Sequence, residues 1–148
     1  MDFAHLHLHT TFSLLDGANR LDDVCLKAKA NGMSAVAMTD HGNLSGAVQW
    51  LQAGQRHGIK TIVGMEAYVA PGSRHDRAEE SSGTHDYNHL ILLATDDIGY
   101  RNLCALSTKS YTEGFYYKPR IDHELLEQHH HGLIALSGCL RGEVPCAI

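Results

Sequence analysis

A row of histidines alternates with apolar residues at the beginning of the chain. His5, His7 and His9 fall on one side of an extended segment over residues 3–10, and apolar side chains fall on the other side. A period of two residues is typical of a β-strand. The pattern therefore predicts a first strand with one face of imidazoles.

Helical and strand-like patterns then alternate along the sequence. The first predicted elements are a helix at 19–30, a strand at 34–38, a helix at 43–58 and a strand at 59–64 that residues 65–70 extend. After a polar surface loop expected at 71–86, the predicted elements are a strand at 88–95, a helix at 98–110, a short helix begun by Asp122 and ending near 128, and a strand at 132–137. The strand at 88–95 has a continuous apolar centre, which is typical of a buried parallel strand. This alternation predicts an α/β protein with a parallel sheet, either an open doubly wound sheet or part of a barrel.

The size and composition of the chain are those of one globular domain. It has 148 residues, of which 43% are hydrophobic and 20% are charged, so we expect a single domain over 1–148. The net charge of −5 argues against an affinity of the whole surface for nucleic acid or anionic membranes, and a phosphate-bearing substrate must be bound locally. No apolar run approaches the ~20 residues of a membrane helix and no signal peptide opens the chain, which predicts a soluble, cytoplasmic protein without a membrane partner.

Histidine and cysteine usage narrows the chemistry. Twelve histidines are many for this length, and histidine is both the commonest metal ligand and the usual proton carrier near neutral pH. The four cysteines have no CxxC spacing, so a disulfide framework is not expected and the thiols are predicted to be reduced.

Residues of metal-binding types follow the predicted strands, at the ends where ligands gather in such sheets. These residues are His7 and His9 after the first strand, Asp40 and His41 after the second, Glu66 after the third and Cys139 after the last. Imidazole, carboxylate and thiolate together favour Zn²⁺, whereas a carboxylate-rich cluster also suits Mn²⁺, and Mg²⁺ less well. Two or three ions bridged by carboxylates commonly cleave phosphodiesters, so the expected reaction is metal-assisted phosphoester hydrolysis. Asp40 is expected to orient His41 rather than to bind a metal.

Motifs at 7–10, 13–17, 38–43, 64–66 and 137–140 occur in a characteristic order and spacing: HLHT, SLLDG, MTDHGN, GME and SGCL. Through them the chain resembles the PHP (polymerase and histidinol phosphatase) family. Further segments resemble the polymerase branch of that family, the N-terminal PHP domains of bacterial DNA polymerase III alpha subunits; they lie at 12–18, 68–70, 99–103, 113–121 and 132–137.

The resemblance implies a fold and a metal cluster. The implied fold is a distorted (β/α)7 TIM-like barrel, and the implied cluster holds up to three Zn²⁺ ions, with Mn²⁺ or Mg²⁺ as alternatives. Its implied ligands are His7, His9, Asp16, His41, Glu66, His89 and Cys139, of which Asp16 and Glu66 are the implied catalytic residues. His89 rests on the resemblance alone, because it begins its predicted strand. The family completes the cluster with an Asp-x-His-like motif beyond the Cys139 motif, so we expect this chain to be an N-terminal portion without the last strands of the barrel.

Aromatic and basic side chains interleave just before the short predicted helix. Tyr116, Tyr117, Lys118 and Arg120 have the combination that stacks on bases and meets phosphates in single-stranded DNA. A structured loop that packs on the barrel would explain the same residues. Arg74 and Arg77 in the polar loop are weaker candidates for phosphate contacts.

The resemblance also implies a function: a PHP domain of a replicative DNA polymerase that proofreads the primer 3′ end as a metal-dependent 3′–5′ exonuclease. The implied partners are DNA, the remainder of the alpha subunit, and possible contacts with a sliding clamp and a proofreading exonuclease subunit. Two alternatives stay open: a free-standing phosphatase of a small phosphomonoester, and a metal-stabilised structural domain that docks a separate proofreading exonuclease. The segments at 99–103 and 113–121 match the polymerase branch and favour the first hypothesis.

Overall fold

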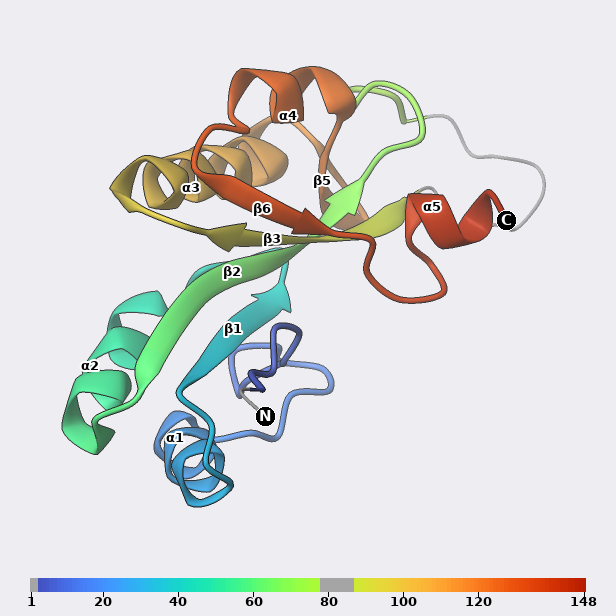
Figure 1. Cartoon of the computed structure of the whole chain (residues 1–148). Helices are drawn as coiled ribbons and strands as arrows, with labels where there is room; N and C mark the ends of the chain where they lie inside the picture. The colour runs from blue at the N-terminus through green and yellow to red at the C-terminus, as the bar shows by residue number, and fades with distance from the viewer. Residues whose placement is uncertain (1–2, 78–86) are drawn as a thin grey trace.

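The structure is a computed structural model that describes residues 3–77 and 87–148 (Figure 1). Its elements, in chain order, are α1 (Leu21–Ala30), β1 (Ala35–His41), α2 (Ala47–His57), β2 (Lys60–Val69), β3 (Asn88–Ala94), α3 (Asp97–Thr112), β4 (Phe115–Tyr116), β5 (Lys118–Ile121), α4 (His123–Gln128), β6 (Leu133–Leu136) and α5 (Glu143–Cys146). The predicted helices and the strands after residue 34 are therefore confirmed, with shifted ends. The sequence patterns did not predict β4, β5 or α5.

Strand β2 is the centre of a six-stranded sheet (Figure 1). It pairs in parallel with β1, which brings His41 opposite Glu66, and near its end it pairs in parallel with β5. On its other side it pairs with β3, and β3 pairs with β6. Because β2 has strand neighbours on both sides, its residue Glu66 can be reached from several segments of the chain.

The strand predicted at 88–95 is present, but its predicted direction is wrong. β3 runs antiparallel to both β2 and β6. A strand that is buried on both faces has the same continuous apolar pattern in either direction, so the pattern could not decide this point. As a consequence, the first residues of β3 lie beside the last residues of β1 and β2, at one end of the strands. His89, at this beginning, is paired with Tyr68 of β2.

The regular strand predicted at 3–10 is also wrong, because the segment forms no ladder with β1. The backbone N–H of Ala37 donates to His5 O at 2.8 Å, and the N–H of Thr39 donates to Leu8 O at 2.9 Å. Three residue steps on the N-terminal segment thus correspond to two on β1, and one extra residue interrupts a two-residue period. In agreement, His5 lines a cavity beside α1 and does not join the other histidines of its predicted face.

The core lies mainly between the sheet and its helices. α1 and α2 pack beside β1 and β2, whereas α3 and α4 lie on the side of β3, β5 and β6 (Figure 1). Trp50 of α2 is fully buried, and its Nε1–H donates to Ile62 O of β2 at 3.0 Å. The opposite face of the sheet carries a smaller apolar cluster around Ala37, Ile91 and Leu93. Since paired residues share a face, His41 and Glu66 belong to this second face.

The described part of the polar loop is held in place by buried charges. Arg74 is buried, and its guanidinium pairs with Asp122 at 3.0 Å and with Glu113 at 2.8 Å. Asp122 caps α4 as predicted. Arg77 Nη1–H donates to Phe115 O at 2.6 Å. The guanidinium of Arg74 is committed to these ion pairs, so a phosphate contact by Arg74 is not supported, whereas Arg77 is exposed and its phosphate contact stays a prediction. Residues 78–86 of the predicted loop lie outside the described residues.

No helix in the described ranges, 3–77 and 87–148, combines the length and the apolar character needed to cross a membrane.

Candidate metal centre

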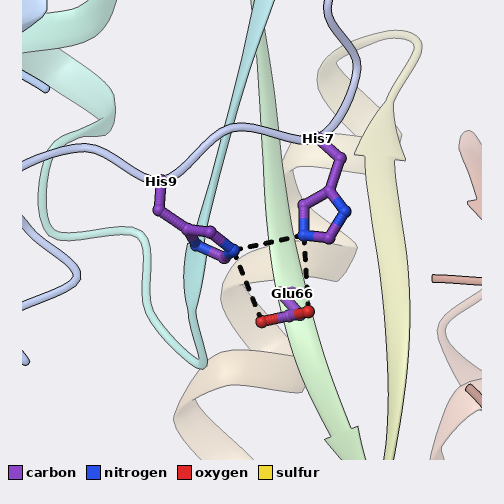
Figure 2. A group of neighbouring side chains, drawn as sticks. All are labelled: His7, His9 and Glu66. Atoms are coloured by element: carbon purple, nitrogen blue, oxygen red, sulfur yellow. Dashed lines mark hydrogen bonds and ion pairs between the residues drawn. The ribbon is translucent and has the colours of Figure 1, made fainter. Parts of the chain in front are cut away.

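The carboxylate of Glu66 is the centre of the site. Glu66 is only 1% exposed, and four imidazoles surround it. Its Oε1 lies 3.4 Å from His7 Nε2 and 3.1 Å from His89 Nδ1. Its Oε2 lies 3.7 Å from His9 Nε2 and is in close contact with His41 Nδ1. Figure 2 shows His7 and His9 pointing from the N-terminal segment toward Glu66 on β2.

Two sets of potential ligand atoms share this carboxylate. The first set is His7, His9 and Glu66, and the second is Glu66, His89 and Cys139. Within each set the ligand atoms lie within 4.8 Å of one another. The two imidazoles of the first set approach to 3.2 Å, and Cys139 Sγ lies 3.4 Å from His89 Nδ1. A carboxylate shared between two such sets can bridge two metal ions.

Two buried atoms fit metal binding independently of the sequence motifs. Among the described residues, His41 Nδ1 and Glu66 Oε2 are buried and make no hydrogen bond, although they contact each other as an ion pair. Buried polar atoms in proteins almost always have a hydrogen-bonding partner or coordinate an ion. A divalent cation is the kind of partner that an imidazole nitrogen and a carboxylate oxygen can share. The residues present therefore fit a metal centre.

The surroundings shift the pKa values of His9, Glu66 and His41. For His9 and Glu66 the shift favours the deprotonated form, which is the form that binds a metal. Burial and the neighbouring His41 lower the pKa of His9, which favours its neutral imidazole. Burial alone would raise the pKa of Glu66, but the contacts with His41 and His89 outweigh it and hold that pKa far below its usual range. The contact with Glu66 raises the pKa of His41 against the effect of burial. Metal binding must therefore displace a proton from His41 as the solution becomes more acidic.

Asp16 reaches the site from a tight turn. Its carboxylate lies 3.1 Å from His41 Nε2, on the side of that ring opposite Glu66. The turn closes through the N–H of Gly17, which donates to Ser13 O at 2.7 Å. A Cβ at Gly17 would lie 1.8 Å from Thr10 O, so the turn requires glycine at this position.

Asp40 does not contact the imidazole of His41, and the expected orienting contact is corrected by the structure. Neighbouring residues of a strand point to opposite faces, so Asp40 is turned away from the ring of His41. Its fully buried carboxylate instead accepts hydrogen bonds from the N–H and hydroxyl of Thr10, at 2.6 and 2.7 Å, and from Ser13 Oγ at 2.7 Å. Ser13 Oγ in turn lies 3.2 Å from His9 Nδ1. Ser13 Oγ also accepts from the backbone N–H of His41 at 3.2 Å, so Asp40 supports both His9 and the backbone of His41 through Ser13.

A cavity of about 600 Å³ opens beside the cluster. Asp16, His41 and His89 of the cluster line it. The other residues that line it are Phe12, Ser13, Leu14, Leu15, Asn43, Ser45, Tyr68, Tyr87, Tyr111, Lys118, Pro119 and Arg141. The aromatic residues among them were missed by the sequence patterns. Tyr68 alone had a usable signal, because it follows Glu66 by two residues and so shares its strand face.

The four residues predicted to bind DNA, Tyr116, Tyr117, Lys118 and Arg120, do not form one continuous exposed surface. Lys118 lines the cavity, and its Nζ lies 5.5 Å from the ring centroid of Tyr68. Tyr117 is exposed outside the cavity lining, and Tyr116 is partly buried. Arg120 is 3% exposed and donates to the carbonyl oxygens of nearby loop residues. A DNA contact by Arg120 is therefore not supported, because its guanidinium binds the backbone carbonyls of Arg74 and Asp76 in the polar loop and of Gly114.

Removing both histidines of the first set tests whether the two ligand sets bind metal separately. The change of His7→Ala together with His9→Ala is expected to lower the bound metal and the melting temperature of the metal-loaded protein, because metal binding stabilises the folded state. The set formed by His89 and Cys139 is expected to keep part of the metal. Elemental analysis and thermal melting provide the two measurements.

The matched control for this change is His130→Ala with His131→Ala, in the exposed histidine run. The control is expected to leave the metal content and melting temperature unchanged. Metal content in the His7 and His9 variant equal to that of the control would contradict the assignment.

The fold and the site define an α/β protein with a histidine- and carboxylate-rich metal-binding centre at one edge of its sheet. Residues 5–148 match the model of the PHP domain, and the chain belongs to this family. Its sheet is part of the TIM-like barrel of that family, as expected from the resemblance.

The chain is similar in sequence to DNA polymerase III alpha subunits of several bacteria. The DNA polymerase III subunit alpha of Aquifex aeolicus is 58% identical over 145 residues, which cover 95% of this chain and 12% of that protein. The corresponding subunits of Treponema pallidum and Thermus aquaticus are 54% and 53% identical, and each match covers 98% of this chain. The chain spans about 12% of the length of these relatives.

Solved structures share the fold at lower identity. A protein proposed to be a metal-dependent phosphoesterase, from Bifidobacterium adolescentis, has a TM-score of 0.52 and 19% identity, with 74% of this chain and 33% of that chain covered. An amidohydrolase from Chromobacterium violaceum has a TM-score of 0.50 and 27% identity, with 72% of this chain and 32% of that chain covered.

Proposed function

We propose that this chain is the PHP domain of a bacterial DNA polymerase III alpha subunit and that its metal centre hydrolyses phosphodiesters at the 3′ end of DNA. The observation that carries the proposal is the buried Glu66, which two ligand sets share beside an open cavity. The identity of 53–58% to named alpha subunits supports the polymerase branch over a free-standing phosphatase of small phosphomonoesters. The whole subunit would act as a DNA-directed DNA polymerase during replication in the cytoplasm.

The residues that would hold the metal are those implied by the motifs: His7, His9, Asp16, His41, Glu66, His89 and Cys139. Their imidazole, carboxylate and thiol groups favour Zn²⁺, up to three ions, and suit Mn²⁺ better than Mg²⁺. When bound, such ions supply Lewis acidity, which activates water and stabilises negative charge on a phosphoester.

The two carboxylates proposed as catalytic have different surroundings. Glu66 is buried and charged, so it is suited to holding the centre together rather than to exchanging protons with solvent. Asp16 has a side chain that is 58% exposed and lines the cavity. It can therefore accept a proton from a water molecule that attacks a phosphoester in the cavity. His41, which lies between the two carboxylates, keeps Asp16 oriented.

The proposed partners follow from the polymerase assignment. They are DNA, through its primer 3′ end, and the remainder of the alpha subunit. Contacts with a sliding clamp and with a separate proofreading exonuclease belong to the same proposal.

The direct test is the release of mononucleotides from a 3′-mispaired primer-template in the presence of Mn²⁺ or Zn²⁺. The unmodified protein is expected to release nucleotides, and Asp16→Asn is expected to reduce the rate by about 100-fold, within the range of general-base effects. Asp97→Asn, in the exposed first turn of α3, is the matched control and should retain the full rate.

Equal release by the Asp16→Asn variant and the control would show that the hydrolysis does not use this site. No release by any of the three proteins would overturn the exonuclease proposal. That result would favour the alternative, a metal-stabilised structural domain that docks a separate exonuclease.

A further inference from the structure

Aromatic rings continue outward from the metal centre along the cavity. The ring of Tyr68 is stacked 6.1 Å from that of His41, with an interplanar angle of 8°. The ring of Tyr87 meets that of Tyr68 edge to face at 4.9 Å. Tyr68 is 5% exposed, so it forms the floor of the cavity. A ligand that reaches the metal centre through this cavity must pass over aromatic surface.

Tyr111, near the end of α3, offers accessible ring surface in this cavity. It is 47% exposed, and its ring is stacked on that of Phe115 at 6.1 Å and 25°. The contact with Phe115 orients the ring of Tyr111 without covering it. Such an oriented, half-exposed ring is what a flat ligand needs for stacking.

Positive charge accompanies these rings, although the whole chain is acidic. Lys118 and Arg141 both line the cavity. The Nζ atom of Lys118 lies 5.5 Å from the centroid of Tyr68. The carboxylate of Asp16, which contacts His41 of the metal centre, lines the same cavity. Aromatic rings beside a lysine, with metal ligands beyond them, suit a ligand that has a planar group and a phosphate.

The mouth of the cavity adds apolar surface. Leu14 and Leu15 line it and are almost fully exposed, which is unusual for two adjacent leucines. Both precede Asp16 in its turn, so this apolar surface is tied to the metal centre. A volume of about 600 Å³ is in the range of pockets for single small ligands.

We propose that this cavity is a pocket for one unpaired nucleotide. The base of the terminal nucleotide stacks on Tyr111, and Lys118 binds the phosphate that leads to the metal centre. Stacking does not depend on the identity of the base, but it requires a base that has left its pair. The pocket therefore selects frayed or mispaired ends. This inference rests on the proposed function for the chemistry, and it adds the substrate form that the site takes.

The test is the binding of a fluorescently labelled single-stranded oligothymidylate by the metal-free protein, measured as anisotropy. Base–aromatic stacking contributes about 1–3 kcal/mol, so Tyr111→Ala is expected to weaken binding about 5- to 150-fold. Tyr111→Phe keeps the ring and should bind like the unmodified protein. Lys118→Ala should weaken binding and reduce its salt dependence. Lys60→Ala, at the exposed start of β2 far from the cavity, is the charge control.

An oligothymidylate with an abasic 3′ residue isolates the contribution of the base. The unmodified protein should prefer the intact end, and Tyr111→Ala should remove this preference. Equal binding by the Tyr111→Ala variant, or no preference for the intact end, would overturn the pocket. Loss of binding in Tyr111→Phe as well would also overturn it, because stacking alone cannot explain that result. Melting curves of each variant verify that it is folded.

The two proposals fail in different ways. Binding that depends on Tyr111, without nucleotide release by the metal-loaded protein, would support the pocket and overturn the exonuclease. Release that Tyr111→Ala leaves unchanged would support the exonuclease and overturn the pocket.

Discussion

Glu66→Gln is expected to abolish most metal binding and to lower phosphodiester hydrolysis on the order of a hundredfold or more. The amide has nearly the shape of the carboxylate, but it lacks the charge and one of the two acceptor oxygens. Both ligand sets depend on this side chain, whereas the His7 and His9 variant affects only one of them. The change is therefore expected to have the larger effect.

Hydrolysis rates and the rise in melting temperature on addition of Zn²⁺ or Mn²⁺ measure the effect of Glu66→Gln. Glu127→Gln, on the exposed side of α4, is the matched control and should behave like the unmodified protein. A Glu66→Gln variant that is still stabilised by metal to the full extent would contradict the central position of this carboxylate.

Asp40→Ala is expected to destabilise the fold on the order of 3 kcal/mol and to reduce metal affinity about 10- to 100-fold. Asp40 accepts three buried hydrogen bonds from Thr10 and Ser13, and alanine leaves these donors without their acceptor. The turn that carries Asp16 begins at these residues. Ser13 also contacts His9, so two potential ligands lose their support together.

Denaturant unfolding of the metal-free protein gives the change in free energy, and metal titration gives the change in affinity. The control is Asp22→Ala, which removes an exposed carboxylate paired with Arg56 and His57 and should change the free energy of unfolding far less than Asp40→Ala does, because exposed ion pairs are screened by water. If Asp40→Ala bound metal as tightly as the unmodified protein, the prediction would be contradicted. The turn at 13–17 would then keep its position without the carboxylate of Asp40.

The sequence patterns predict the helices and most strands because periodicity and capping are local properties. Asp122 is an example, since its side chain accepts from the backbone N–H of Leu125 as an N-cap residue should. The rule that ligands gather at strand ends likewise brings His41 and Glu66 together, and the structure pairs them across β1 and β2.

The direction of β3 depends on tertiary packing, and the sequence patterns predicted it wrongly. His89 is therefore missed by the rule for parallel strands, although an antiparallel β3 brings it to the same edge. The burial of Arg74 is a similar case, because its partner Asp122 is 48 residues away in the sequence. A polar residue in a loop looks solvated until its distant partner is known. The extra residue between His5 and Leu8 has no local signal either.

The number of metal ions bound per chain is the most direct test of the shared carboxylate. Elemental analysis after equilibration with Zn²⁺ or Mn²⁺ and removal of free metal measures it in the unmodified protein and in Glu66→Gln. A site built on Glu66 predicts at least two ions per chain in the unmodified protein and a loss of most of them in the variant. A single ion or none in the unmodified protein, or equal metal content in the two proteins, would contradict it.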